Sequence, residues 1–245
     1  MAGKVQNAIL RKLVSQWTQV QAQLARLNNS ASALPQDGYA IFHPADSSAV
    51  DSVSFDLSPV VLNLPERASD SELELFVVLK GRITFDRSDF CDDRPLRTRN
   101  FGTEIGYFRV DGNRLDHILG AHYDYSEDEL GHPAFHAQLR SYASEFRPHI
   151  VAQLGIQFEA GEDKISGILK TARLPTAQMD LFSTILQLFA DHLLYAGSSV
   201  DERRAFNRLL DKNRFCQGAA HRIPRLGSEQ ACECYRALHW YPVLE

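Results

Sequence analysis

The chain has 245 residues, of which 44% are apolar, and its formal net charge is −5 at pH 7 with a pI near 6.0. These values describe a globular protein that can bury a core, and they argue against a generally basic nucleic-acid-coating protein, so any RNA or DNA binding would need a local basic groove. No stretch approaches the roughly 20 apolar residues that cross a bilayer, and the first residues lack the apolar core of a signal peptide. We therefore expect a cytoplasmic protein without a membrane partner.

Residues 5–27 have the periodicity of an amphipathic helix. Apolar residues recur every three or four positions and form one stripe on the helix surface. The stripe consists of Val5, Ile9, Leu13, Trp17, Val20, Leu24 and Leu27. The outer side is expected to carry Gln16, Gln19, Gln21 and Gln23. The stripe can cover the core of its own domain, which is the simpler interpretation, or it can bind a protein partner.

The middle of the chain is rich in strand signals. Short β-like pieces fill residues 39–64, and strands at 73–79 and 82–85 flank Lys80-Gly81, which predicts a hairpin corner there. The charged segment 86–100 is expected to be a loop.

A second hairpin has the clearest turn signal in the chain. Asp111-Gly112-Asn113 separates strand-like residues 103–110 from residues 115–125. Residues 133–139 can form a third strand that returns beside 115–125. These strands predict an antiparallel meander.

The chain becomes helical towards its C-terminus. Large apolar residues follow helical spacing over 176–195, and residues 200–210 and 230–238 are expected to form two further helices. The order of helix, many strands and then helices predicts an α+β fold, with an antiparallel meander sheet flanked by an N-terminal amphipathic helix and C-terminal helices.

No clear linker divides the chain, so we expect a single α+β domain over residues 1–245. Its parts would be the N-terminal helix at 5–27, a sheet region at 39–158 and a helical C-terminal region at 176–245.

The candidate site is the stretch from His117 to Arg140, which holds four of the nine histidines. If residues 115–125 form a strand, alternation places His122 and Asp124 on one face, with Tyr123 and His117 on the other. A carboxylate beside an imidazole can hold its tautomer and raise its basicity.

The returning strand adds a second polar face. His136, Gln138 and Arg140 alternate along it and share that face. If the two faces coincide, the site would hold two histidines for proton transfer and a cation for a pentavalent phosphate. Metal-independent RNA cleavage needs these groups.

Two other interpretations of the histidines remain open. His122, Asp124, His132 and His136 could together bind zinc, manganese or iron, although Pro133 prevents the His-Pro-x-x-His stretch from presenting two ligands on one helical face. Histidines on strands are also commonly structural. Standard enzyme signatures are absent, including paired HxT or HxS motifs, HxHxH, GxSxG, GxxxxGK[ST] and GxGxxG.

A second group of candidate ligands lies near the C-terminus. It consists of Cys216, His221, Cys232, Cys234 and His239. Four of them could close a tetrahedral structural zinc site, but the C-x-C spacing is unusual for a chelate, and buried free thiols are the alternative. No other cofactor is indicated.

The stretch HYDYSEDELGHPAFHAQLR, followed about thirty residues later by RLPTAQMDLFSTILQLFADHL, resembles a set of bacterial toxin–antitoxin and phage-defence-associated proteins with an HPxxH motif. The shared features cover residues 104–196. The resemblance implies a nucleic-acid-directed role with His132 and His136 as the carried-over positions. Where that pattern has a further histidine, this chain has Gln138, which can orient a phosphate but cannot shuttle protons.

The first functional hypothesis is a toxin-like or defence-associated ribonuclease that needs no metal. His136 and His122 would be general acid and base, and Asp124 would orient His122. His132, in the loop, could supply a second proton carrier, and Gln138, Arg140 and Tyr123 would bind substrate. The alternatives are a non-catalytic subunit that docks a larger defence or nucleic-acid complex through residues 1–30, and a metal-dependent hydrolase of a small substrate.

Overall fold

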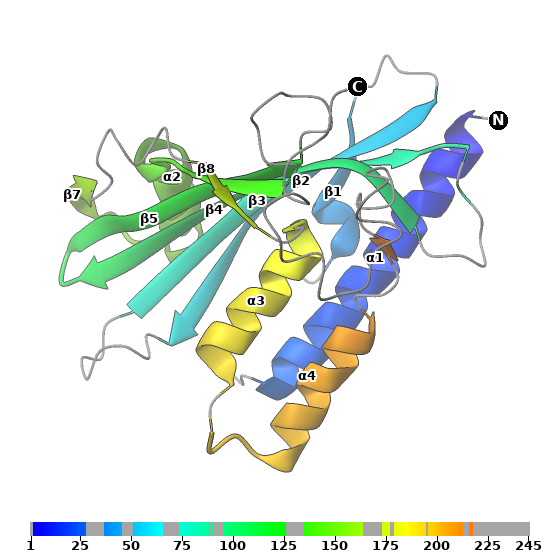
Figure 1. The fold of residues 1–245 in the computed structure, drawn as a ribbon. Coiled ribbons are helices and arrows are strands. Elements are labelled where there is room, and N and C mark those ends of the chain that lie inside the picture. The colour runs from blue at the N-terminus through cyan, green and yellow to red at the C-terminus, as the bar shows by residue number, and fades with distance from the viewer. Residues whose placement is uncertain are drawn as a thin grey trace.

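The fold is an open antiparallel sheet with helices from both ends of the chain. The computed structural model describes residues 2–27, 37–45, 51–65, 74–88, 90, 96–125, 135–163, 173–176, 179–194, 196–212 and 216–217. Its elements are α1 (Ala2–Leu27), the 3-10 turn η1 (Gly38–Ala40), β1 (Phe42–Pro44), β2 (Ser52–Pro65), β3 (Glu74–Asp86), β4 (Leu96–Asp111), β5 (Arg114–Tyr125), β6 (Phe135–Leu139), α2 (Ala143–Leu154), β7 (Glu159–Asp163), β8 (Arg173–Pro175), α3 (Leu181–Leu193), α4 (Val200–Lys212) and β9 (Cys216–Gln217). The expected α+β class is confirmed (Figure 1).

Strands β1 to β6 follow one another across the sheet in chain order, and each pairs antiparallel with the next. Strand β8 continues the order beyond β6, while β7 pairs in parallel with β5 and β9 in parallel with β4. The predicted meander is therefore confirmed for its central strands. Sequential antiparallel strands need only short connections, which suits the turn-rich sequence between them.

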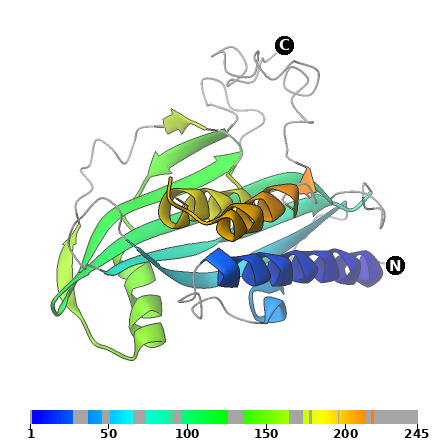
Figure 2. The same cartoon turned by 90° about the horizontal axis from the view of Figure 1, so that it is seen from below.

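Helices α1 and α3 pack on one face of the sheet, which we call the helix face, and α4 lies against α1 (Figures 1 and 2). The apolar stripe of α1 is in this core: the ring of Trp17 is fully buried and meets Phe42 of β1 edge-on, with centroids 6.3 Å apart. Phe42 in turn stacks on Phe182 of α3 at 6.2 Å. The simpler interpretation of the stripe is confirmed. The prediction that Gln16 lies on the outer side of the helix is wrong, because Gln16 is buried.

Helix α2 covers part of the opposite face, which we call the polar face. Its Phe146 and Ile150 pack on Phe76 of β3 and Phe108 of β4. An added Cβ at Gly106 would lie only 2.7 Å from Phe146, so this glycine lets α2 approach the sheet closely. The sequence patterns did not predict α2, which interrupts the expected sheet region and contains Pro148.

Three of the predicted boundaries are wrong. Lys80 and Gly81 form no hairpin corner, because β3 runs through them without a break and Gly81 pairs with Thr103. Part of the expected loop at 86–100 is the start of β4. The helix expected from 176 begins at Leu181, where the carboxylate of Asp180 accepts the Ser183 backbone N–H at 3.1 Å and caps it.

A bulge changes the alternation in β5. Phe108 pairs with His117 whereas the preceding Tyr107 pairs with Leu119, so β5 carries one extra residue at Ile118. The expectation that His117 faces away from His122 is therefore wrong, because the extra residue returns His117 to the polar face. There it is buried beneath α2, where its Nε2 accepts the backbone N–H of Tyr142 at 3.4 Å.

The predicted turn at Asp111-Gly112-Asn113 is confirmed, and Gly112 has a positive φ of 59° there. The helix at 200–210 is also confirmed and extends to Lys212. The helix expected at 230–238 lies outside the described residues. Among the helices that the structure describes, none is long and apolar enough to cross a membrane.

Candidate active site

The central candidate residues meet on the polar face. Strands β5 and β6 pair so that Asp124 is opposite His136 and His122 is opposite Gln138. Residues opposite each other in an antiparallel pair point to the same side of the sheet. The predicted coincidence of the two polar faces is therefore confirmed.

Asp124 contacts both imidazoles. Its Oδ2 lies 2.8 Å from Nε2 of His122 in a hydrogen bond. Its Oδ1 lies 2.8 Å from Nδ1 of His136, which is an ion-pair distance although the two groups are not aligned as in a good hydrogen bond. One carboxylate thus contacts both histidines, whereas the sequence predicted its contact with His122 alone.

The electrostatics keep Asp124 ionised. Burial raises the pKa of its carboxyl, but hydrogen bonding and charge attraction from His122 and His136 lower the pKa more, so that it lies well below its usual range. Because an ionised carboxylate only accepts hydrogen bonds, the Nε2 of His122 must carry the shared proton. The nitrogen of His122 that can exchange a proton is then Nδ1.

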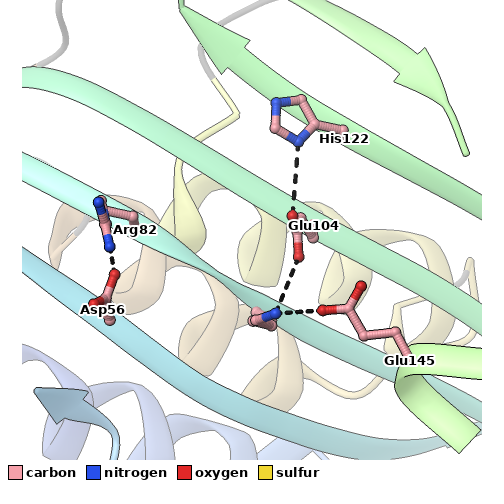
Figure 3. Close-up of polar contacts among 6 residues, drawn as sticks. Asp56, Arg82, Glu104, His122 and Glu145 are labelled. Atoms are coloured by element: carbon pink, nitrogen blue, oxygen red, sulfur yellow. Dashed lines mark hydrogen bonds and ion pairs between the residues drawn. The ribbon is translucent and has the colours of Figure 1, made fainter. Parts of the chain in front are cut away.

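Nδ1 of His122 faces a second carboxylate. Oε1 of Glu104, on β4, lies 4.0 Å from it, and Oε2 of Glu104 lies 3.8 Å from the ammonium group of Lys80 on β3. Lys80 also pairs with Glu145 of α2, and this contact, with the charge of Glu104, raises the pKa of Lys80. A chain of charges therefore runs from α2 across three strands to His122 (Figure 3).

The two histidines differ in their exposure to solvent. The side chain of His122 is 21% exposed, whereas that of His136 is 1% exposed. The side chains of His122 and Asp124 are partly open to the polar face, although Nδ1 of His122 is itself buried, and His136 is closed to a substrate in this conformation. Figure 3 shows His122 and Glu104 on the side of the sheet that faces away from the helices behind it.

Gln138 and Arg140, the two residues expected to bind phosphate, differ from each other in position. Gln138 is on the polar face opposite His122. Arg140 follows the end of β6, its backbone N–H donates to the Gly120 carbonyl at 2.8 Å, and its side chain is exposed. The positive charge of Arg140 lies near the buried hydroxyl of Tyr142. Burial and the charge of Glu104 raise the pKa of this hydroxyl, and Arg140 offsets part of that rise.

Tyr123 does not join this site. It lies on the helix face beside Tyr107 of β4, where burial and the charge of Asp191 on α3 raise its pKa. The strand alternation explains this, since Tyr123 lies between His122 and Asp124 and must point the other way. The prediction of Tyr123 as a substrate contact beside His122 is wrong.

The remaining predicted ligands cannot be placed. His132, His221, Cys232, Cys234 and His239 lie outside the described residues. The backbone of Cys216 belongs to β9 and pairs with Leu96 of β4. Within the described part of the chain, no group of three or more His, Cys, Asp or Glu side chains is arranged to hold a metal ion. The structural zinc stays a prediction.

Lys80, Glu104, Glu145 and Tyr142 join the site from elements that the sequence patterns did not connect with it. A signal was present for two of them, because Lys80 and Glu104 are charged residues inside strands that also carry buried apolar residues. Such charges indicate a solvated sheet face, but their proximity to His122 depends on strand register.

Comparisons of the chain with protein-family models, with curated proteins and with solved structures give no match. The fold defines an α+β protein with an open antiparallel sheet, and its site is a pair of histidines joined by an aspartate.

The role of Asp124 in stability can be tested by acid titration. Because its folded-state pKa lies below the unfolded value of about 3.9, ionised Asp124 stabilises the fold fully above that pH, and the stabilisation is lost as the pH falls through the folded-state pKa. Asp124→Asn should therefore lower the free energy of unfolding at neutral pH by about 1–2 kcal/mol. The difference from wild type should shrink below about pH 4, as measured by urea unfolding.

Asp56→Asn is the matched control. Asp56 also lies on a strand of this sheet, but its side chain is 44% exposed, and its pair with Arg82 at 2.5 Å is a surface pair. Exposed pairs contribute about 0–1 kcal/mol. If Asp124→Asn is as stable as wild type at neutral pH, Asp124 does not hold the two imidazoles in solution.

Proposed function

We propose that this protein is a metal-independent ribonuclease in which His122 is the acid–base group. The observation that supports this most directly is the position of His122 between two carboxylates, with Nε2 2.8 Å from Asp124 and Nδ1 4.0 Å from Glu104. Asp124 holds the tautomer in which Nδ1 is free to take a proton. His122 is also the more exposed histidine of the pair.

In the proposed reaction, Glu104 moves away from Nδ1 of His122, which is buried in this conformation, so that Nδ1 removes the proton of a ribose 2′-hydroxyl. The 2′ oxygen then attacks phosphorus. The new 2′ O–P bond forms, the P–O5′ bond breaks, and the leaving 5′ oxygen takes a proton from water. The hydroxide that remains takes up the proton from Nδ1 of His122, which returns the imidazole to its starting form. Gln138 and Arg140, on and after β6, hold the phosphate as its negative charge moves to the non-bridging oxygens. The products are a 2′,3′-cyclic phosphate and a 5′-hydroxyl.

His136 has a different role in this proposal from the general acid expected from sequence. Its imidazole is buried and contacts Asp124. We assign it as a positioning residue, which keeps Asp124 ionised and oriented towards His122. His122 alone then exchanges protons with substrate.

The resemblance at HYDYSEDELGHPAFHAQLR supports a toxin-like or defence role for such an activity. Expression of the active protein would then inhibit growth, and loss of His122 would relieve the inhibition. A docking role for α1 would have to use its outer face, because its apolar stripe lies in the core of its own domain.

The test is cleavage of single-stranded RNA by the purified full chain. Cleavage should persist in EDTA, leave a 2′,3′-cyclic phosphate, and stop when the attacking ribose is replaced by 2′-deoxyribose. A requirement for a divalent metal would favour the hydrolase alternative. Failure of the folded protein to cleave RNA would overturn the proposed function.

A further inference from the structure

The ammonium group of Lys80 lies between two carboxylates of the polar face. Lys80 is opposite Glu104 in the pairing of β3 with β4, and Glu104 is opposite His122 in the pairing of β4 with β5, so the three side chains form a row. Glu145 of α2 reaches the same ammonium group (Figure 3). Lys80 donates its hydrogen bond to Glu145, whereas Oε2 of Glu104 lies 3.8 Å away, beyond hydrogen-bond distance. The two carboxylates therefore share Lys80 unequally.

Glu104 is left with an oxygen that has no hydrogen bond. Its Oε2 is buried and accepts none from the described residues. Because such a buried acceptor is costly, Glu104 would accept a hydrogen bond from Lys80 if Glu145 did not hold the ammonium group. The other oxygen of Glu104, Oε1, lies 4.0 Å from Nδ1 of His122, which is also buried. Glu104 thus lies beside the atom that has to take a proton.

The pair of Lys80 with Glu145 is not needed to hold α2 on the sheet. The two side chains are 38% and 41% exposed, and pairs as exposed as this contribute little to stability. Phe146 and Ile150 of α2 are fully buried against the sheet and keep the helix in place. The pair therefore matters mainly for where it places the ammonium group of Lys80.

We propose that Glu145 and Lys80 are positioning residues that control access to Nδ1 of His122 through Glu104. While Glu145 holds Lys80, Glu104 stays beside His122 and covers Nδ1. When Glu145 releases Lys80, the ammonium group donates to Oε2 of Glu104 and draws this carboxylate towards β3, away from His122. The consequence for catalysis rests on the proposed ribonuclease function, but the change in access to Nδ1 does not.

Access to Nδ1 is measured by treating the purified full chain with diethyl pyrocarbonate, which acylates unprotonated imidazole nitrogens, and following His122 by mass spectrometry. Nε2 of His122 carries the proton shared with Asp124, so Nδ1 is the atom that reacts. In Glu145→Ala the acylation rate of His122 should rise about 3-fold, since an exposed ion pair shifts an equilibrium only modestly. Asp56→Ala is the matched control, because Asp56 is 44% exposed and pairs with Arg82 on the same sheet. It should leave the rate unchanged.

Substitutions of Lys80 distinguish a positioning role from a structural one. Lys80→Met removes the cation that can draw Glu104 away, so the acylation rate of His122 should fall below that of wild type. Lys80→Arg keeps a cation and should stay close to wild type. Adding Glu145→Ala to Lys80→Met should change nothing further, because Glu145 acts only through Lys80. A pair that merely held α2 would give changes of the same sign for both partners.

His117 is the internal control for unfolding in these variants. It is 0% exposed beneath α2, so its acylation should stay slow wherever the fold is intact. Equal acylation of His122 in wild type and Glu145→Ala would overturn the proposal. Changes of the same sign in Glu145→Ala and Lys80→Met, or no acylation of His122 in any of these proteins, would overturn it as well.

Cleavage of RNA separates this proposal from the ribonuclease function. If both are correct, kcat/KM for cleavage should rise about 3-fold in Glu145→Ala and fall in Lys80→Met. Cleavage of RNA with unchanged acylation in Glu145→Ala would refute the positioning role and leave the ribonuclease standing. The expected acylation changes without cleavage of any RNA would refute the ribonuclease and leave the positioning role standing.

Discussion

Replacing His122 by alanine should lower kcat/KM for RNA cleavage by about 10²–10⁴-fold, the usual contribution of a general acid–base group. The loss should fall mainly on kcat, since substrate contacts through Gln138 and Arg140 remain. The fold should be retained because the His122 side chain is partly exposed and lies on the polar face, outside the apolar core of the sheet. Cleavage rates and the far-ultraviolet circular dichroism of the variant measure the two effects.

His136→Ala should have a smaller effect on rate, about 10-fold, because His136 acts through Asp124 and does not contact substrate. His136→Asn should restore much of the loss, since its amide N–H can donate to Asp124 where Nδ1 of His136 lies. Adding His136→Ala to His122→Ala should give little further loss, because two residues that act through one group are not additive.

His43→Ala is the control for removing a histidine from this sheet. His43 lies on β1 at an exposed position, where its Nε2 is 2.8 Å from the hydroxyl of Ser58. Its removal should leave cleavage unchanged. If His43→Ala and His122→Ala lower the rate equally, the loss comes from general damage to the sheet and His122 is not the acid–base group.

Trp17→Ala should lower the free energy of unfolding by about 3–5 kcal/mol, a large part of the roughly 5–15 kcal/mol of a typical domain. Trp17 is 0% exposed and joins α1 to β1 through Phe42, which stacks on Phe182 of α3. Removing the indole therefore leaves a cavity where three elements meet. Equilibrium unfolding in urea measures the change.

Thr18→Ala, the next residue of α1, is exposed and is the matched control. Its hydroxyl donates to the Val14 carbonyl at 3.0 Å within the same helix, so its loss should change stability by no more than about 0.5 kcal/mol. A loss of less than about 1 kcal/mol for Trp17→Ala would show that α1 is not part of the folding core. That result would favour the docking alternative, in which the stripe serves a partner.

The docking hypothesis suggests deleting residues 1–30 as a test. This deletion would not distinguish a docking subunit from a ribonuclease. The stripe of α1 supplies Ile9, Leu13 and Trp17 to the helix-face core. Removing it should unfold the domain and so abolish both cleavage and partner binding. Substitutions on the outer face of α1 are the better test of docking.

The part of the site that depends on strand alternation could be predicted from the sequence. Alternation was enough to place His122 with Asp124 on one strand face and His136 with Gln138 on another, since side chains on a strand have a period of two. The pairing of β5 with β6 shows that these two faces are the same. The same rule failed for His117, because a bulge inserts a residue that the sequence pattern does not mark.

The rest of the site depends on the register of strands that lie far apart in sequence. Lys80 meets Glu104 because β3 and β4 pair at those residues, and Glu145 reaches Lys80 because α2 lies on the polar face. Helix α2 was not expected, since it contains a proline. These contacts follow from tertiary packing rather than from any local pattern.

By itself, the sequence determined the α+β class, the amphipathic helix at the N-terminus, the turn at Gly112 and the shared strand face of His122 and Asp124. All of these depend on short-range periodicity and turn chemistry, which are local properties of the chain. Only the tertiary structure decided that His136 lies beside Asp124 and is buried, and that Glu104 faces His122. Burial and cross-strand distance depend on which segments pack together, and that is a property of the whole fold.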